Sequence, residues 1–256
     1  MQKILLSRHS QTLSNAIDDM LDLHGPENMH KVGRTLEAYR KREKVKSFAD
    51  LERHLQEYGK SLRDLSAYTF DFYRPEQIVH AKNLTGRGFN QAQTLGMYLE
   101  QQNLKSLVAI TSGLERTHET LHTAHQSGNL PIVKHIKDPD LNETISAELF
   151  DHVNRITLEP YQRKWIEARP SAADVGQTAY ISLLYTALAR PDHDIFAVLH
   201  GALNSAFLNL IDHSDKHLRD YHMDNCGLIT IELEDTQMRI ADEKSYTDIL
   251  GEVYSR

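Results

Sequence analysis

Short apolar runs alternate with helical patterns along most of this chain. Apolar and β-branched runs bounded by polar residues predict strands at 3–7, 107–111, 131–136, 195–200 and 228–233. Apolar residues recurring every three or four positions predict helices at 12–23, 88–102, 115–125, 161–168, 173–189 and 202–211. Strands that alternate with helices form parallel βαβ units. We therefore expect an α/β fold, a three-layer open sheet that is mostly parallel and has helices on both faces.

One segment, residues 23–81, interrupts this alternation and is rich in charge. Between Lys31 and Asp64 there are ten Lys and Arg against six Asp and Glu. An amphipathic helix is predicted by apolar residues spaced four, three, four and three apart, at Leu51, Leu55, Tyr58, Leu62 and Leu65. Ser47 and Asp50 match a capping box for this helix. We expect a single domain over residues 1–256, with 23–81 as a helical insertion or cap after the first βα unit. Its charges form either a solvated helix surface or a cationic lid that attracts an anionic substrate.

Composition narrows the class of protein. The 256 residues are 40% hydrophobic and 25% charged, which is ordinary for a globular protein. The net charge of -7 argues against a nucleic-acid or anionic-membrane binder. The single cysteine, Cys226, allows no internal disulfide, which fits a reducing compartment. The apolar run at 4–6 is too short for a signal peptide or a membrane helix, so we expect a cytoplasmic protein.

Basic side chains follow the predicted strand ends. Arg8 and His9 come directly after the first strand, and in open α/β sheets this edge is where ligands bind. Arg116 and His200 stand in two more segments that begin where a strand ends and a helix starts. The carboxyl ends of parallel strands meet at one edge of the sheet, so we expect these side chains to converge. Helix N-termini add free N–H groups and a positive dipole end. Such a pocket has the electrostatics that a phosphoryl group needs.

Four segments, in this order, resemble the motifs of the histidine phosphatase superfamily, also called phosphoglycerate mutase-like. The family's Arg-His-Gly-x-Thr-x-x-Asn is matched at Arg8, His9, Thr12 and Asn15. Its Leu-Thr-x-x-Gly-x-x-Gln-Ala is matched at Leu84, Thr85, Gly88, Gln91 and Ala92. Its Ser-Pro-Leu-x-Arg-Ala-x-x-Thr is matched at Ser112, Leu114, Arg116 and Thr120. Its His-Gly is matched at His200 and Gly201, and a later Asn-Cys pair is similar to Asn225 and Cys226.

The resemblance implies a role for each pocket residue. His9 would attack the phosphoryl group and carry it as a phosphohistidine. Arg8, Arg116 and His200 would hold the phosphoryl oxygens, with further pocket contacts from Asn15 and Gly201. The resemblance implies no metal and no other cofactor.

The family also needs a carboxyl acid, because an alkoxide is a poor leaving group. In many members this acid lies in a Leu-x-Glu segment after the third motif, and Leu141-Asn142-Glu143 resembles that segment. Glu143 is therefore the expected proton donor, and a solvated loop glutamate is the alternative. Glu148 and Asp151 are the other candidates.

The chain departs from the family pattern at three positions. Ser10 replaces the glycine after the nucleophile, Gly113 replaces a proline, and Ala147 replaces a glycine four residues after the acid. The long mutase-type sequence does not follow the first motif, so we predict a phosphatase rather than a mutase. The expected substrate is a phosphorylated small molecule or a phosphoprotein.

Two alternatives stay open. The chain also contains a literal His-Glu-x-x-His at His118, Glu119 and His122, which on a helix could bind zinc, with Glu143 in a third-ligand segment. A zinc peptidase would follow from that interpretation. The second alternative is a catalytically weak family member that binds a phosphorylated ligand without turnover, for which Ser10 is the motive.

Overall fold

The computed structural model describes residues 2–12, 15, 84, 86–102, 104–143, 170–212 and 223–255. The expected insertion at 23–81, the expected helix at 161–168, most of that at 12–23, and the candidate acids Glu148 and Asp151 lie outside these residues. By its internal contacts the chain divides into two compact units. One comprises Met1–His9 with Gln91–Arg256, and the other Ser10–Asn90.

In the described part of the chain, six strands form one mixed sheet. They are β1 (Gln2–Arg8), β2 (Leu107–Ser112), β3 (Ile132–Asp138), β4 (Asp194–Leu199), β5 (Leu228–Glu234) and β6 (Gln237–Lys244). Their order across the sheet is β3-β2-β4-β1-β5-β6. The pairs β1–β4, β2–β4 and β2–β3 are parallel, and β5 is antiparallel to both β1 and β6. The sheet is therefore mostly parallel, as the sequence predicts.

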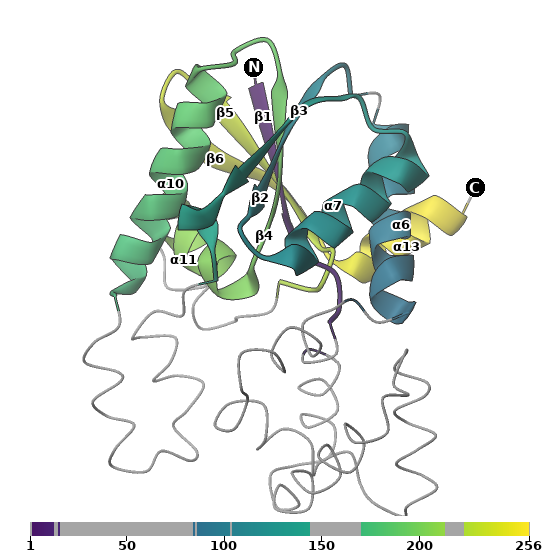
Figure 1. Ribbon diagram of the computed structural model, residues 1–256. Coiled ribbons are helices and arrows are strands. Elements are labelled where there is room, and N and C mark those ends of the chain that lie inside the picture. Colours follow the sequence, from purple (N-terminus) through teal and green to yellow (C-terminus); the bar gives the residue numbers. More distant parts are fainter. Residues whose placement is uncertain are drawn as a thin grey trace, which may run out of the picture. The chain divides into compact units, whose positions relative to one another are not determined.

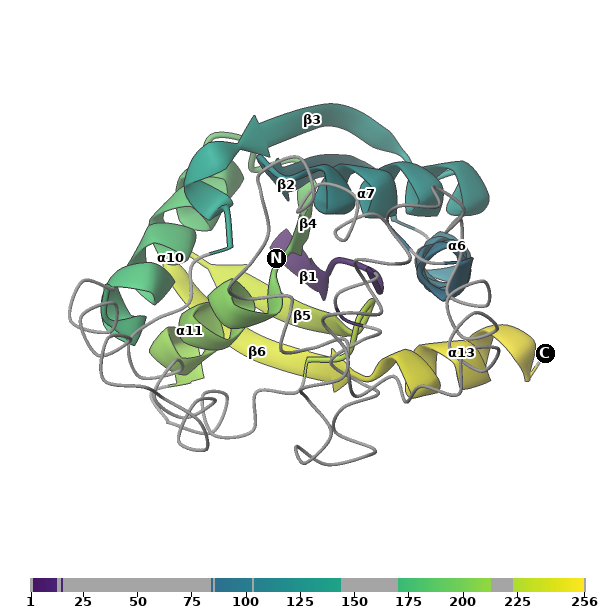
Figure 2. The same ribbon diagram turned by 60° about the horizontal axis from the view of Figure 1, so that its bottom comes forward.

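Helices cover both faces of this sheet (Figures 1 and 2). They are α6 (Gly86–Gln101), α7 (Glu115–Gly128), α10 (Ala172–Leu188), α11 (Gly201–Asp212) and α13 (Tyr246–Tyr254), with a short 3₁₀ turn η3 at Pro139–Leu141. Helices α10 and α11 lie on one face, and α6, α7 and α13 on the other (Figure 2). This arrangement confirms the expected three layers.

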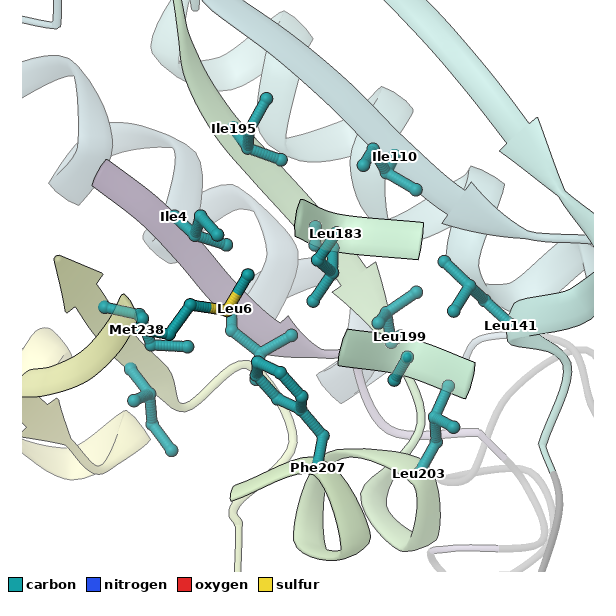
Figure 3. Packing of buried hydrophobic residues seen from close by; sticks show 14 of the residues in the cluster. Ile4, Leu6, Ile110, Leu141, Leu183, Ile195, Leu199, Leu203, Phe207 and Met238 are labelled. Atoms are coloured by element: carbon teal, nitrogen blue, oxygen red, sulfur yellow. The ribbon is translucent and has the colours of Figure 1, made fainter. Parts of the chain in front are cut away.

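Alternate residues of the central strands enter two separate cores. Ile4 and Leu6 of β1 pack with α10 and α11, where Phe207 of α11 is 1% exposed (Figure 3). Leu5, between them, packs into the core under α6, α7 and α13. Successive strand side chains point to opposite faces, so a strand buried on both faces is a continuous apolar run. This explains why the predictions of β1, β2 and β4 agree with the structure to within one residue at each end. The prediction of the exposed edge strand β3 also agrees, to within two residues, but it rests on a weaker signal.

Two elements, β6 and α13, were not predicted from the sequence. Strand β6 is an edge strand in which only Met238 is buried, so it lacks a continuous apolar run. Helix α13 buries only Ile249 and begins at a capping box formed by Ser245 and Asp248. Strand β6 carries too few apolar residues for a pattern based on hydrophobicity. Helix α13 does carry one, with Tyr246, Ile249, Leu250 and Val253 spaced three, one and three apart, so this signal was missed. Within the described ranges, none of the helices is long and apolar enough to cross a membrane.

Candidate active site

The pairing of β1 with β4 brings His9 and His200 together. Arg8 is opposite Leu199 in the parallel register, and the backbone N–H of His9 donates to the Leu199 carbonyl at 2.9 Å. His9 and His200 therefore follow directly from neighbouring strand ends. Their rings meet edge to face with centroids 5.3 Å apart. Both side chains are buried.

A turn before β5 closes on the end of β1. The Asn225 side-chain amide donates to the His9 carbonyl at 2.8 Å, and the Cys226 N–H donates to the Arg8 carbonyl at 3.1 Å. Cys226 has a φ of 61°, a conformation that residues other than glycine rarely adopt. Its thiol is buried and makes no disulfide. The Asn-Cys pair thus fixes the backbone that carries His9, a structural role that the residue types alone do not indicate.

Arg116, in the first turn of α7, connects the predicted site residues. Its guanidinium is 3% exposed. Nε donates to His9 Nε2 at 3.1 Å, and Nη2 lies 3.1 Å from His200 Nδ1. Nη2 also donates to Glu143 Oε2 at 2.6 Å. Three residues that are far from Arg116 in sequence, His9, Glu143 and His200, therefore meet at one guanidinium.

Because Arg116 can only donate, it determines which ring nitrogen of each histidine accepts a hydrogen bond. A guanidinium has only N–H donors and is not deprotonated in proteins. His9 Nε2 and His200 Nδ1 therefore accept from Arg116 and carry no proton in this structure. An unprotonated ring nitrogen is the form of histidine that acts as a nucleophile.

Arg8 lies beside this group, at the end of β1. Its Nη1 donates to the Met223 carbonyl at 2.9 Å. Its Nε is buried and has no acceptor among the described residues. A buried donor without an acceptor costs about 1–3 kcal/mol, and more when the group is charged. This orphaned donor is the kind of group that an anionic ligand satisfies.

Two neighbours hold Glu143 in place. Leu141 is fully buried in the core that includes α10 and α11. The Asn142 side-chain oxygen accepts from the Gly113 N–H at 2.7 Å. The family's proline at position 113 has no N–H to donate, so glycine permits a bond that the usual residue cannot make. Glu143 itself is 30% exposed and bonded to Arg116, which differs from a solvated loop glutamate.

Asn15 and Gly88 belong to the unit Ser10–Asn90. Asn15 Oδ1 accepts from the Thr12 N–H at 3.2 Å and from the Thr12 hydroxyl at 2.9 Å. Thr12 also pairs with Leu84 in an isolated antiparallel bridge. A side chain on Gly88 would lie 2.1 Å from the Gln11 carbonyl oxygen, so this motif position requires glycine. The role of Asn15 in the pocket stays a prediction, as does the effect of the buried Ser10.

The His-Glu-x-x-His segment lies on α7, and among the described residues its two histidines make no hydrogen bond with Glu143. His118 Nε2 lies 3.2 Å from the Ser112 carbonyl oxygen and 3.2 Å from the Thr111 hydroxyl. Glu143, the expected third ligand, is bonded to Arg116 instead. Over the ranges that the structure describes, no three His, Cys, Asp or Glu side chains are grouped to hold a metal ion.

Known structures share this fold. The chain is similar to phosphoglycerate mutase from Bacillus anthracis, with a TM-score of 0.56, 13% identity, and coverage of 97% of this chain and 95% of that one. It is similar to phosphoserine phosphatase from Entamoeba histolytica in complex with 3-phosphoglyceric acid, with a TM-score of 0.54, 15% identity, and coverage of 96% of this chain and 98% of that one. It is also similar to a mycobacterial glucosyl-3-phosphoglycerate phosphatase, with a TM-score of 0.52, 14% identity, and coverage of 96% of this chain and 100% of that one. These identities are low, so the likeness shows the fold alone.

Comparison with sequences gives the family. No curated protein sequence matches the chain. The model of the histidine phosphatase superfamily (branch 1) matches residues 77–244, which include the second, third and fourth motifs and, with them, Arg116, Glu143 and His200. This membership supports activity as a phosphatase or a mutase. The chain belongs to the histidine phosphatase superfamily.

Proposed function

We propose that this protein is a phosphatase that hydrolyses a phosphomonoester through a phosphohistidine on His9. The observation that carries the proposal is the bonding of Arg116, which reaches His9, His200 and Glu143 at once. A nucleophile, a cationic donor and a carboxyl group therefore lie within one hydrogen-bonded cluster. Phosphoryl transfer needs little more than positioning and stabilisation of charge.

In the first step, the phosphoryl group displaces Arg116 Nε from His9 Nε2, and the lone pair that this frees attacks phosphorus. The N–P bond forms as the bond from phosphorus to the ester oxygen breaks. Arg116 and Arg8 bind the non-bridging oxygens, and the buried Arg8 Nε gains an acceptor. Once the phosphoryl group has displaced Arg116 from His200 Nδ1, that nitrogen takes up a proton from solvent and donates it to a phosphoryl oxygen. Gly201 contributes the N-terminus of α11, where N–H groups favour an anion.

Glu143 supplies the proton that the leaving oxygen takes. Before the reaction its Oε2 is bonded to Arg116 at 2.6 Å. The phosphoryl oxygens compete for that guanidinium, and the freed carboxylate takes up the proton of the phosphomonoester monoanion and passes it to the ester oxygen. In the second step, a water molecule attacks the phosphohistidine and gives a proton back to Glu143. Phosphate leaves, and His9 returns to its neutral form.

The proposed substrate is a phosphorylated small molecule or a phosphoprotein. Solved proteins of this fold include a phosphatase bound to phosphoserine and one bound to 3-phosphoglyceric acid. Water, rather than a second sugar or acid, is the proposed acceptor of the phosphoryl group. This choice rests on the absence from the sequence of the long mutase-type segment after the first motif.

The test is a screen of phosphorylated metabolites and an aryl phosphate with the wild-type, His9→Ala and His122→Ala proteins. His122 is an exposed histidine on α7 and serves as the matched control. We expect phosphate release by wild type and His122→Ala and none by His9→Ala. Rapid quenching of the wild type should trap acid-labile phosphate on His9. Turnover that survives in His9→Ala contradicts the mechanism.

A wild-type protein that binds phosphorylated ligands but releases no phosphate would instead support the catalytically weak family member. Binding measured by calorimetry with phosphoserine and 3-phosphoglycerate separates these outcomes. In that case Arg116→Ala should abolish binding, because the guanidinium is the proposed anchor of the phosphoryl group.

A further inference from the structure

Ser112, the last residue of β2, lies against the far side of the His200 ring. Its hydroxyl oxygen is 2.8 Å from His200 Nε2, and both side chains are fully buried. The contact follows from the register of β2 and β4. Thr111 is opposite Val198, so Ser112 at the end of β2 lies beside the end of β4, which His200 follows directly.

The Ser112 hydroxyl has two further contacts. The Leu114 N–H donates to it at 3.1 Å. The Thr117 hydroxyl lies 3.1 Å away and donates its own proton to the Leu114 carbonyl at 2.7 Å. Thr117 therefore accepts from Ser112, because its proton is already committed. The Ser112 proton points toward Thr117, and its oxygen is left to accept.

These directions determine which nitrogen of His200 carries the proton. Ser112 Oγ accepts, so His200 Nε2 is the donor. Arg116 Nη2 donates, so His200 Nδ1 is the acceptor. One chain of donors runs from Arg116 through His200, Ser112 and Thr117 to the Leu114 carbonyl, and every proton in it has an acceptor. The opposite tautomer would set the Nδ1–H of His200 against an N–H of the guanidinium.

We propose that Ser112 is a positioning residue that holds His200 in its Nε2–H tautomer and orients the ring toward the reacting group. The inference rests on the proposed function. In the described part of the chain, the charged and titratable groups that the ring meets include Arg116, His9 across the edge-to-face contact, and Glu143 through Arg116. When the phosphoryl group displaces Arg116 Nη2 from His200 Nδ1, the ring takes up a proton on that nitrogen and donates it to a phosphoryl oxygen. The Nε2–H bond to Ser112 persists, so the ring keeps its orientation through the reaction.

The inference is tested by ¹⁵N NMR of the histidine rings, with the His200 signals assigned by their loss in His200→Gln. We expect an Nε2–H ring at neutral pH in the wild type. In Ser112→Ala we expect a mixture of tautomers. We also expect kcat to fall by about 10²-fold and KM to change less, because misplacing a binding group by about 1 Å can slow a reaction that much. Ser112→Thr keeps the hydroxyl and should restore the wild-type tautomer and most of kcat. A structural role alone would lower the melting temperature without changing the ring signals.

Each possible result supports or overturns the role of Ser112. A wild-type His200 that carries its proton on Nδ1, or a Ser112→Ala protein that keeps a pure Nε2–H ring, overturns the inference. The wild-type spectrum decides alone if Ser112→Ala does not fold. A wild type without phosphatase activity refutes the proposed function and leaves the tautomer result intact. An active wild type whose tautomer is independent of Ser112 refutes only this inference.

Discussion

The guanidinium Nε of Arg116 lies 3.1 Å from Nε2 of His9 and donates a hydrogen bond to it. The lone pair of the nucleophile therefore points at this guanidinium, and a phosphoryl group must displace Arg116 Nε before His9 can attack. The same guanidinium also bonds His200 and Glu143. Arg116 is therefore the residue on which the arrangement of the site depends.

Replacement of Arg116 by lysine should reduce activity although the charge is kept. One ammonium group cannot reproduce the planar set of donors that reaches His9 and His200 together. We expect kcat to fall by about 10²- to 10³-fold, the range for loss of one preorganised donor. Arg239→Lys, at an exposed pair with Glu232, should leave kcat unchanged. A wild-type kcat in Arg116→Lys would contradict the bidentate arrangement.

Glu143→Gln should affect substrates according to their leaving group. The variant cannot donate a proton, so hydrolysis of an alkyl phosphate should slow by about 10²- to 10⁴-fold. An aryl phosphate whose phenol leaves readily should be affected much less. Steady-state kinetics on both substrates, with Glu115→Gln as the control at an exposed position of α7, measure the difference. Equal losses on both substrates would contradict Glu143 as the proton donor and leave Glu148 and Asp151 as the candidates.

The bond from Gly113 to Asn142 should support Glu143. Asn142→Ala removes the acceptor, and Gly113→Pro removes the donor. Each change should lower kcat by about 10- to 10²-fold on alkyl phosphates, because Glu143 loses its anchor. The double variant should be no slower than the worse single variant, since both remove the same bond. Fully additive losses would show that the two residues act separately.

Phe207→Ala should destabilise the fold more than it affects chemistry. Phe207 is 1% exposed in the core under α10 and α11. Truncation of such a ring costs about 3–5 kcal/mol, because the cavity closes only in part. Tyr185→Ala, at a side chain that is 74% exposed, should change stability by less than about 0.5 kcal/mol. Urea unfolding of both variants gives the comparison, and a loss under about 1 kcal/mol for Phe207→Ala would contradict the packing.

His135 should make the protein less stable in mild acid. The residue is exposed to solvent, but partial desolvation by its neighbours still lowers the pKa of His135 below its ordinary 6.5, with further lowering from His118 and Lys137. The folded state then binds its proton at a lower pH than the unfolded state does. Stability is present above 6.5 and is lost as the pH falls from that value toward the folded pKa.

Melting temperatures at about pH 7.5 and 5.5 test this effect, since that window brackets the ordinary histidine pKa. His135→Gln should lose less stability between the two values than wild type does. His122→Gln, at an exposed position, should behave like wild type. An equal acid loss in His135→Gln and wild type would contradict the assignment.

The sequence by itself determined the layers of the fold and predicted the candidate site residues. Strands buried on both faces are continuous apolar runs, so β1, β2 and β4 could be located by hydrophobicity alone. Arg8, His9, Arg116 and His200 were identified because each follows a strand end within a family motif. Edge elements such as β6 were missed, because a strand with one buried residue carries no periodic signal.

Only the tertiary structure decided how these residues are connected. No local pattern shows that one guanidinium bonds His9, His200 and Glu143, since those residues are separated from Arg116 by long stretches of chain. The roles of Asn142 and Ser112 likewise depend on the direction of individual hydrogen bonds. Strand register brings the groups together, and donor and acceptor geometry then fixes their protonation. The hydrophobic pattern is a local property of the sequence, whereas the direction of these hydrogen bonds is defined only when distant segments pack together.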